Sequence, residues 1–196
     1  MARPRTVSDE EILEATGRAV GRVGPAALTL ADVAREAGIA PPTLIKRFGS
    51  KRELLLAFAR RSGEGTRDLF AKARAGTEDP LEALETALLR QATSVRTGEA
   101  MANHLAFLQM EVADEEFRDH VVAHAEVLRD EITRLVKDAV ARKDLPRDTD
   151  ARVLARGVHL LYNGALVTWA MERRGILESA VREAIRFALR RESGKR

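Results

Sequence analysis

The stretch that most constrains the fold of this chain is residues 29–55, TLADVAREAGIAPPTLIKRFGSKRELL. A helix is predicted to begin at Thr29, because its side chain can cap the helix together with Asp32, three residues later. Gly38 then predicts the end of that helix, since glycine tolerates the positive φ of a tight turn. Two prolines follow and suit the first turn of a second helix, where the N–H groups have no partner within the helix. The stretch therefore predicts two short helices joined by a tight turn.

Three residues predict that these two helices pack closely. Ala34 is small enough to let them touch, Gly38 permits the turn, and Leu44 locks the second helix onto the first. This is the arrangement of a helix-turn-helix, whose second helix enters the major groove of DNA. We therefore expect a DNA-binding motif at about residues 29–48.

The same residues resemble a known family, the TetR/AcrR family of bacterial transcriptional regulators. The resemblance covers about residues 8–56 and is carried by T-L-x-x-V-A-x-x-A-G-I-A and P-T-L-I-K-R-F-x-S-K-x-E-L-L. The family usually has a tyrosine where Ile45 stands, and that tyrosine often touches a DNA phosphate, which isoleucine cannot do. The family also often has a serine cap where Ala40 stands. The resemblance implies a DNA-binding head, a body in which a small molecule relaxes DNA binding, and a dimer interface made by the last two helices.

Composition favours a cytoplasmic protein with no membrane segment. The chain has 196 residues and no cysteine, so it can bury a core but has no disulfide or thiol chemistry, which suits a reducing cytosol. The N-terminal sequence MARPRTVSDEE lacks the apolar core of a secretory signal. The longest stretch without Asp, Glu, Lys or Arg, residues 157–171, is shorter than the roughly 20 residues that span a bilayer.

The distribution of charge agrees with a DNA-binding head. Residues 1–61 hold 11 Lys and Arg against 7 Asp and Glu, a net charge of +4. The rest of the chain holds 22 against 23, a net charge of −1. A positive surplus in the half that carries the helix-turn-helix is expected of a protein that binds nucleic acid.

Apolar residues recur at helical spacing along the rest of the chain, and no strand pattern is present. The fold class is therefore predicted to be all-α, with about nine helices. The long fourth helix begins near residue 51 and ends near residue 75, although Gly63 and Gly65 leave a break inside it open. The later helices are predicted at residues 80–95, 99–112, 115–142 and 150–173, and from residue 177 onward. The predicted domains are a DNA-binding domain over residues 1–62 and a helical ligand-binding and dimerisation domain over residues 63–196.

The candidate DNA contacts lie on and around the second motif helix. Thr43 and Lys46 project on the side opposite Leu44, and the apolar face of Pro42 can meet a thymine methyl group. Cationic side chains near the helix ends suit phosphates. A short basic arm at the N-terminus either reaches the DNA or is a solvated tail. The predicted DNA-binding residues are Arg3, Arg5, Thr29, Pro42, Thr43, Lys46, Arg47 and Lys51.

No motif for catalysis is present, so the chain is predicted not to be an enzyme. It has no G-x-S-x-G, no P-loop and no H-E-x-x-H. His120 and His124 lie four residues apart on one helix, but nothing completes a four-ligand metal set around them. We therefore expect no cofactor and no metal.

Polar residues on apolar helix faces are the candidates for a ligand pocket. Gln91 and His124 stand where the pattern calls for a hydrocarbon side chain, and His104 stands beside such a position. A buried polar group needs a partner. A bound small-molecule effector is one partner, and an internal hydrogen bond or water is the alternative. The predicted effector-binding residues are Gln91, Met101, His104, Phe107, Leu108 and His124.

A homodimer on double-stranded DNA is the expected assembly. One helix-turn-helix covers only a few base pairs, so two-fold dimers on palindromic operators are the usual solution. The resemblance points to the last two helices for the interface. The predicted interface residues are Leu161, Ala165, Trp169, Leu177, Val181, Ile185 and Leu189.

Two interpretations of the function follow. The first is a sequence-specific transcriptional regulator, a repressor that a small-molecule effector releases from a palindromic operator. The alternative is a helix-turn-helix adaptor that a protein partner regulates and that has no small-molecule pocket.

Overall fold

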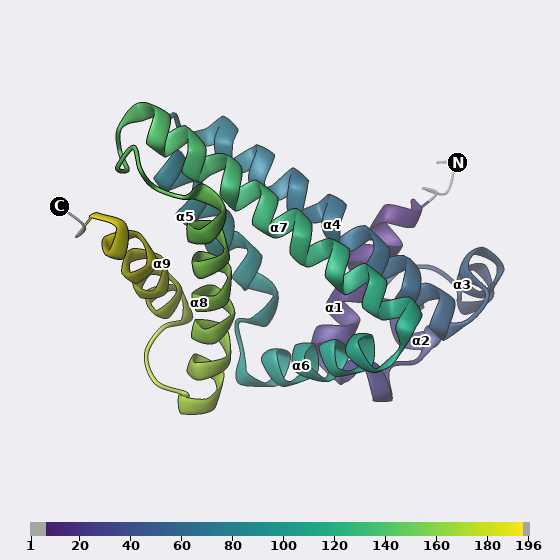
Figure 1. Cartoon of the computed structure of the whole chain (residues 1–196). Coiled ribbons are helices and arrows are strands. Elements are labelled where there is room, and N and C mark those ends of the chain that lie inside the picture. The colour runs from purple at the N-terminus through teal and green to yellow at the C-terminus, as the bar shows by residue number, and fades with distance from the viewer. Residues whose placement is uncertain (1–6, 194–196) are drawn as a thin grey trace. The chain divides into compact units, whose positions relative to one another are not determined.

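A computed structural model describes residues 7–193 of the chain, with side chains up to residue 190. This part of the chain contains helices and no strand (Figure 1). The helices are α1 (Asp9–Ala27), α2 (Leu30–Ala37), α3 (Pro41–Phe48), α4 (Lys51–Gly76), α5 (Pro80–Gln91), a 3₁₀ turn η1 (Ala92–Val95), α6 (Gly98–Ala113), α7 (Glu115–Arg142), α8 (Ala151–Glu172) and α9 (Leu177–Ser193). The predicted all-α class is confirmed.

The chain forms two compact units. The first runs to Ser62 and also includes Ala102–Val121, and the second comprises Gly63–Met101 and the chain from Val122 onward. The division at residue 62 is the one predicted from the sequence, but the segment from Ala102 to Val121 groups with the first unit rather than the second. Helices α4, α6 and α7 contribute residues to both units.

Helix α1 begins and ends through local hydrogen bonds and backbone geometry. The Ser8 hydroxyl accepts from the Glu11 N–H while the Glu11 carboxylate accepts from the Ser8 N–H, a complete capping box. Near the other end Gly24 takes a φ of 75°, which interrupts the helix before Pro25. A Cβ at Gly24 would lie 2.7 Å from the Asn103 side chain, so this position requires glycine.

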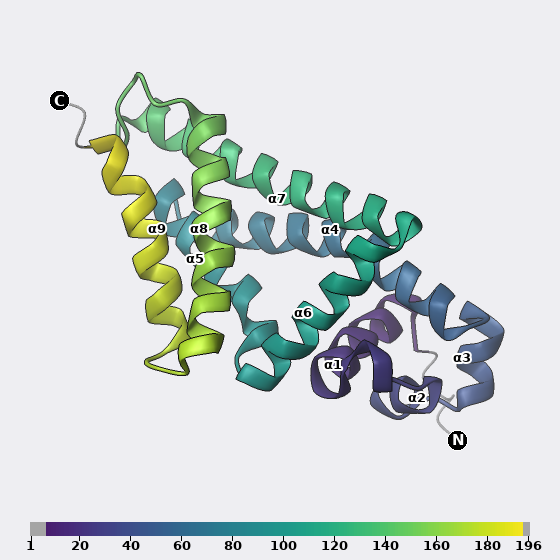
Figure 2. The same ribbon diagram turned by 60° about the horizontal axis from the view of Figure 1, so that its bottom comes forward.

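The helix-turn-helix forms as its sequence predicts (Figure 2). Thr29 and Asp32 cap α2 reciprocally, and Gly38 ends it with a φ of 68°. Ala34 and Leu44 are fully buried, which places the two helices in contact through their small and large apolar residues. Ala40 precedes α3 and makes no side-chain cap.

A distant segment completes the first unit. The Phe107 ring of α6 lies 5.6 Å from the Phe58 ring and 6.5 Å from the Phe117 ring. Arg52 donates to Asp114 and Glu116, and its guanidinium lies over the Phe117 ring. These contacts explain why Ala102–Val121 groups with this unit. Its buried core consists of Ile12, Leu13, Ala19, Val20, Leu28, Val33, Ala34, Leu44, Leu54, Leu55, Leu56, Ala59, Phe107 and Phe117.

The second unit is a helical bundle in which α8 and α9 lie side by side (Figures 1 and 2). Asp150 caps α8 by accepting from the N–H groups of Arg152 and Val153. The largest buried side chains of the second unit include Phe70, Leu84, Leu88, Ile132, Leu135, Val136 and Ile185.

One predicted helix ends earlier than expected, and the open question of a break in the fourth helix is answered. The helix predicted over residues 80–95 is α5 followed by the 3₁₀ turn η1. The Thr93 and Ser94 hydroxyls donate to the carbonyls of residues 90 and 91, and such side-chain bonds compete with helical hydrogen bonding. Helix α4, by contrast, runs unbroken through Gly63 and Gly65.

Replacing two glycines by alanine should change stability in opposite directions. Gly38→Ala should destabilise by about 1–2 kcal/mol, because alanine disfavours the left-handed conformation and no atom lies within 4 Å of the new Cβ to add strain. Gly65 lies on an exposed face of α4, and again no atom lies within 4 Å of an added Cβ. Because alanine favours a helix interior over glycine, Gly65→Ala should stabilise by about 0.5–1 kcal/mol. Urea unfolding of both variants measures this, and equal midpoints for the two would contradict it.

Candidate nucleic-acid interface

The outer face of α3 is uncharged apart from one lysine, Lys46. Leu44 is fully buried, and this turns Pro42, Thr43, Ile45 and Lys46 outward, where all four are exposed. An α-helix with its side chains is roughly 10–12 Å in diameter. A helix of this size fits the major groove of B-DNA, which is about 12 Å wide. The predicted readers Pro42, Thr43 and Lys46 therefore lie together on one accessible helix.

Lys46 differs from its neighbour Arg47 in being free. It has no hydrogen-bond or ion-pair partner among the residues that the structure describes. Arg47 instead donates to the Val7 carbonyl at 2.6 Å and pairs with Asp9 at the start of α1. Lys46 is thus the cation of α3 that is available to a base or phosphate, whereas Arg47 ties α3 to α1.

Two further predicted contacts are engaged in local structure. The Lys51 ammonium donates to the Ala26 carbonyl at 3.1 Å. The Thr29 hydroxyl accepts from the Asp32 N–H and donates to the Asp32 carboxylate, and these Thr29 hydrogen bonds hold the pKa of that carboxyl below its usual value. A phosphate at either position has to compete with these bonds. The predicted contacts Arg3 and Arg5 lie outside the described residues.

The predicted effector residues fall into two groups, one in each unit. In the second unit Thr66 is buried and joins His124, whose Nε2 lies 2.9 Å from the Thr66 hydroxyl, to Gln91, whose amide is 3.5 Å from it. Gln91 and His124 therefore satisfy each other through Thr66, the internal hydrogen bonding that the sequence left open. Met101 is buried in the core of the same unit.

The remaining predicted effector residues belong to the first unit. Phe107 is part of its buried core, Leu108 is half-buried and His104 is exposed. The six predicted residues therefore do not form one site within either unit.

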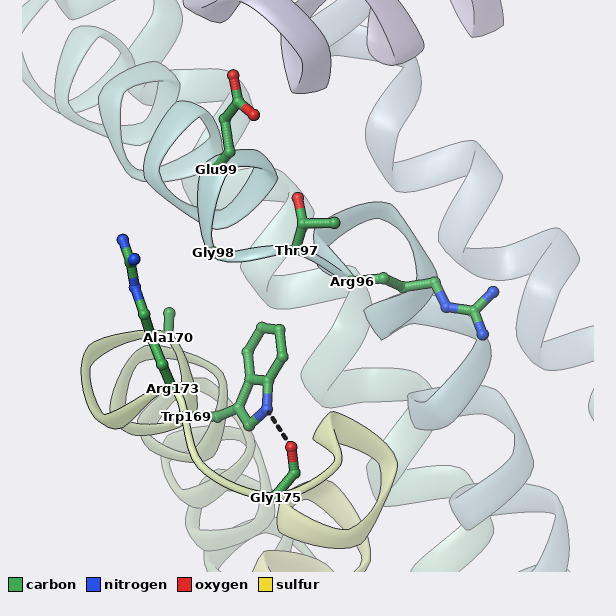
Figure 3. Close-up of a pocket in the computed structure, with 8 residues that line it drawn as sticks. All are labelled: Arg96, Thr97, Gly98, Glu99, Trp169, Ala170, Arg173 and Gly175. Atoms are coloured by element: carbon green, nitrogen blue, oxygen red, sulfur yellow. Dashed lines mark hydrogen bonds between the residues drawn. The ribbon is translucent and has the colours of Figure 1, made fainter.

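A cavity of about 340 Å³ lies in the second unit, where α6 begins and α8 ends (Figure 3). The Trp169 indole N–H donates to the Gly175 carbonyl at 3.4 Å and forms part of the wall. Figure 3 shows the guanidinium groups of Arg96 and Arg173 pointing in different directions. Arg96 also lies 3.5 Å from the Glu178 carboxylate. The cavity thus has an aromatic wall, and the guanidinium groups of Arg96 and Arg173 do not point toward a common position.

Three of the seven predicted dimer residues are used inside the protomer, while the other four stay a prediction. Leu177, Val181 and Ile185 are buried in the core of the second unit. Leu161, Ala165, Trp169 and Leu189 are half-buried. The row Leu177, Val181 and Ile185 identified in the sequence is therefore a face of α9 that packs against the rest of its own unit.

The last two helices were the predicted interface, but the predicted residues on α8 did not include an exposed stripe of this helix. Val153, Leu160 and Met171 are 65%, 63% and 78% exposed. Gly157 and Gly164 stand between them with open space where a side chain would be, and Val167 continues the row. We call residues 153, 157, 160, 164, 167 and 171 the α8 stripe. The alternating spacing of four and three residues is the signal that could have identified it, because it is the repeat of helices that pack along their length.

Glu111 on α6 is a second feature that the sequence analysis did not single out. Its side chain is buried, and burial raises the pKa of the carboxyl to about 7.

Between residues 7 and 193 the structure has no group of three or more His, Cys, Asp or Glu side chains that could hold a metal ion. None of the helices described is both long and apolar enough to cross a membrane.

Comparisons with known proteins agree with this geometry. Residues 12–58 match the family model "Bacterial regulatory proteins, tetR family", and residues 106–186 match "Tetracyclin repressor-like, C-terminal domain". The HTH-type transcriptional regulator BetI of Rhizobium meliloti (strain 1021) is 29% identical over 180 residues, which cover 89% of this chain and 84% of BetI.

Two solved structures share the fold. A TetR transcription regulator from Haloarcula marismortui ATCC 43049 superposes with a TM-score of 0.73 at 23% identity, covering 94% of this chain and 96% of that one. FadR from Bacillus subtilis, solved in complex with stearoyl-CoA, has a TM-score of 0.70 at 12% identity, covering 93% and 98% of the two chains.

Removing the Glu111 carboxyl should make stability less dependent on pH. Because burial raises its pKa from 4.5 to about 7, the folded state holds a proton that the unfolded state releases, so wild-type stability falls as pH rises through that window. Glu111→Gln stays neutral and should gain up to ~3 kcal/mol relative to wild type between pH 4.5 and pH 8. Urea unfolding across this range measures the difference. The same change at the exposed Glu115 is the control, and a parallel pH dependence of wild type and Glu111→Gln would contradict the assignment.

Proposed function

We infer that this chain, which belongs to the TetR family of bacterial regulatory proteins, is a repressor that leaves a palindromic operator when a small molecule binds. The chain is a DNA-binding transcriptional regulator. Repression, the palindrome and the effector are our proposal. The observation that carries it is the exposed outer face of α3 beside the tight turn at Gly38, because a helix held in this way can enter the major groove.

A homodimer is part of the proposal, since TetR-family regulators bind DNA as dimers. We propose that the α8 stripe forms the centre of the interface. Its apolar side chains are exposed in the protomer, and its two glycines leave room for a helix of the second copy to approach closely. A stripe with this spacing packs against its own copy around a two-fold axis. The outer face of α9, with Ser179, Glu183 and Arg186 exposed, provides a polar rim.

A small-molecule effector is proposed from two observations. FadR, which shares the fold, was solved with stearoyl-CoA bound. The cavity beside Trp169 in the second unit has a volume in the range of about 300–1,000 Å³ that is common for ligand pockets. The effector-binding roles of Gln91 and His124 remain a prediction, and their link through Thr66 would have to open for a ligand to use them.

We propose that the protein is not an enzyme. We also propose that it acts in the cytoplasm, the compartment that holds bacterial DNA. The family and its relatives are transcriptional regulators. The alternative, an adaptor controlled by a protein partner, keeps the same DNA-binding head.

Selection of bound sequences from random DNA tests the function. A palindromic site should be recovered, and its half-sites should lie about one helical turn, roughly 34 Å, apart. The recovered site then becomes the assay for the effector. Release by a small molecule supports the repressor, whereas release only by a protein supports the adaptor.

Two lysine substitutions should have different effects on this binding. Lys46→Ala should change the preferred sequence, because Lys46 is the free cation on the outer face of α3. Lys51→Ala should weaken all sequences about equally and reduce the salt slope by about 1, as expected for a phosphate contact. Titrations of both variants against the selected site and a scrambled site, at several salt concentrations, measure this. Unchanged affinity in both variants would remove α3 and the start of α4 from the interface.

A charge in the α8 stripe should give a folded monomer. Leu160→Glu places a carboxylate at a side chain that is 63% exposed in the protomer but lies at the centre of the proposed interface. The control is Val122→Glu on α7, which makes a similar change at a side chain that is 50% exposed. Sedimentation should show a monomer for the first variant and a dimer for the second. If Leu160→Glu dimerises as strongly as wild type, the interface lies on another surface.

A further inference from the structure

An exposed isoleucine lies on one flank of the outer face of α3. The Ile45 side chain is 51% exposed, although the first unit buries Leu44, its neighbour in the chain, completely. Pro42 lies three residues before Ile45 and is also exposed, so the two side chains share one side of the helix. Water therefore covers an apolar surface on the helix that the proposed function places in the major groove.

The other side chains of α3 limit how this helix can recognise bases. Its sequence, PPTLIKRF, contains no Asn or Gln, the residues that pair bidentately with adenine, and no Asp or Glu to accept from cytosine. Arg47 is the residue best suited to guanine, but it is bonded to Val7 and paired with Asp9. Thr43 and Lys46 remain as exposed hydrogen-bonding side chains. Hydrogen bonds from α3 therefore do little to distinguish an A·T pair from the other base pairs.

The major groove offers one apolar group, the methyl on C5 of thymine. Methylation of cytosine at C5 places the same group in the groove. An apolar side chain that packs on this methyl removes both surfaces from water, and this contact distinguishes T·A from C·G without a hydrogen bond.

We propose that Ile45, together with Pro42, reads C5-methyl groups of pyrimidines in the major groove, and that the operator carries a thymine opposite Ile45 in each half-site. The proposal rests on the DNA-binding function and specifies the chemistry that α3 recognises. Ile45 is thus a specificity-determining residue, next in the chain to the exposed Lys46.

Removing single methyl groups from the operator tests this proposal. Each thymine of the selected site is replaced in turn by deoxyuridine, which lacks the methyl and keeps every hydrogen-bonding group. One thymine in each half-site should be sensitive. Replacing that single thymine should lower the affinity for the operator about fourfold, the loss expected for one buried methyl group. Replacing both symmetric thymines should reduce affinity on the order of tenfold, since distant sites add.

Variants of Ile45 assign the effect to this residue. Ile45→Ala should lose most of the difference in affinity between the thymine and deoxyuridine operators, because most of the apolar side chain that senses the methyl is gone. Ile45→Val keeps a branched apolar side chain and should retain the difference. Both changes are at an exposed position, so the variants should fold as wild type does.

A second arm distinguishes the two sources of the methyl group. At the sensitive position a C·G pair should bind worse than T·A, and 5-methylcytosine opposite guanine should recover part of the loss if the methyl alone is read. If 5-methylcytosine recovers nothing while deoxyuridine still weakens binding, Ile45 reads thymine specifically.

Two outcomes overturn the proposal. If wild type binds deoxyuridine operators as tightly as thymine operators at every position, α3 does not read methyl groups, although the DNA-binding function stands. If Ile45→Ala keeps the wild-type difference, another residue reads the methyl. Failure to recover any preferred sequence from random DNA would remove the proposed function itself, and this inference with it.

Discussion

The buried contact of Leu44 with α2 is the interaction on which the rest of the first unit depends. Leu44 and Ala34 are both inaccessible to solvent, and Gly38 supplies the left-handed turn that brings their helices together. Burying one leucine contributes about 1.5–3 kcal/mol, a large share of what holds a helix of only eight residues. Since α3 is too short to be stable alone, its orientation is set by this contact. Which side chains face outward follows directly from which one is buried.

The contact is supported by residues far away in the sequence. Phe107 packs between Phe58 and Phe117, and Arg52 donates to the acidic residues before and within the first turn of α7. Asn103 donates to the Gly21 carbonyl and packs beside Gly24, whose positive φ favours glycine. The head is therefore not a linear N-terminal domain, because its core is completed by the segment from Ala102 to Val121. A ligand that changes the geometry of α6 would act directly on this core.

The second unit shows how helical periodicity can be assigned to the wrong partner. The row Leu177, Val181 and Ile185 has the spacing of an interface, and it is one, but with its own protomer. The α8 stripe is less obvious, because two of its members are glycines, which a search for apolar side chains passes over. Polar residues on apolar faces are similarly ambiguous. Gln91 and His124 are satisfied by the buried Thr66, which no hydrophobic pattern marks as their partner.

Local chemistry along the chain was enough to predict the helices, their caps and the turn. Ser8 with Glu11, Thr29 with Asp32, and Gly38 act within a few residues of themselves, so their effects can be read from sequence. The outer face of α3 followed for the same reason, since helical spacing relates Leu44 to its neighbours. Only the tertiary structure decided that Arg47 pairs with Asp9, that Phe107 belongs to the head, and that the α9 stripe faces inward. These outcomes depend on which surfaces meet across long stretches of chain, and an apolar stripe carries the same pattern whether its own protomer or a second copy covers it.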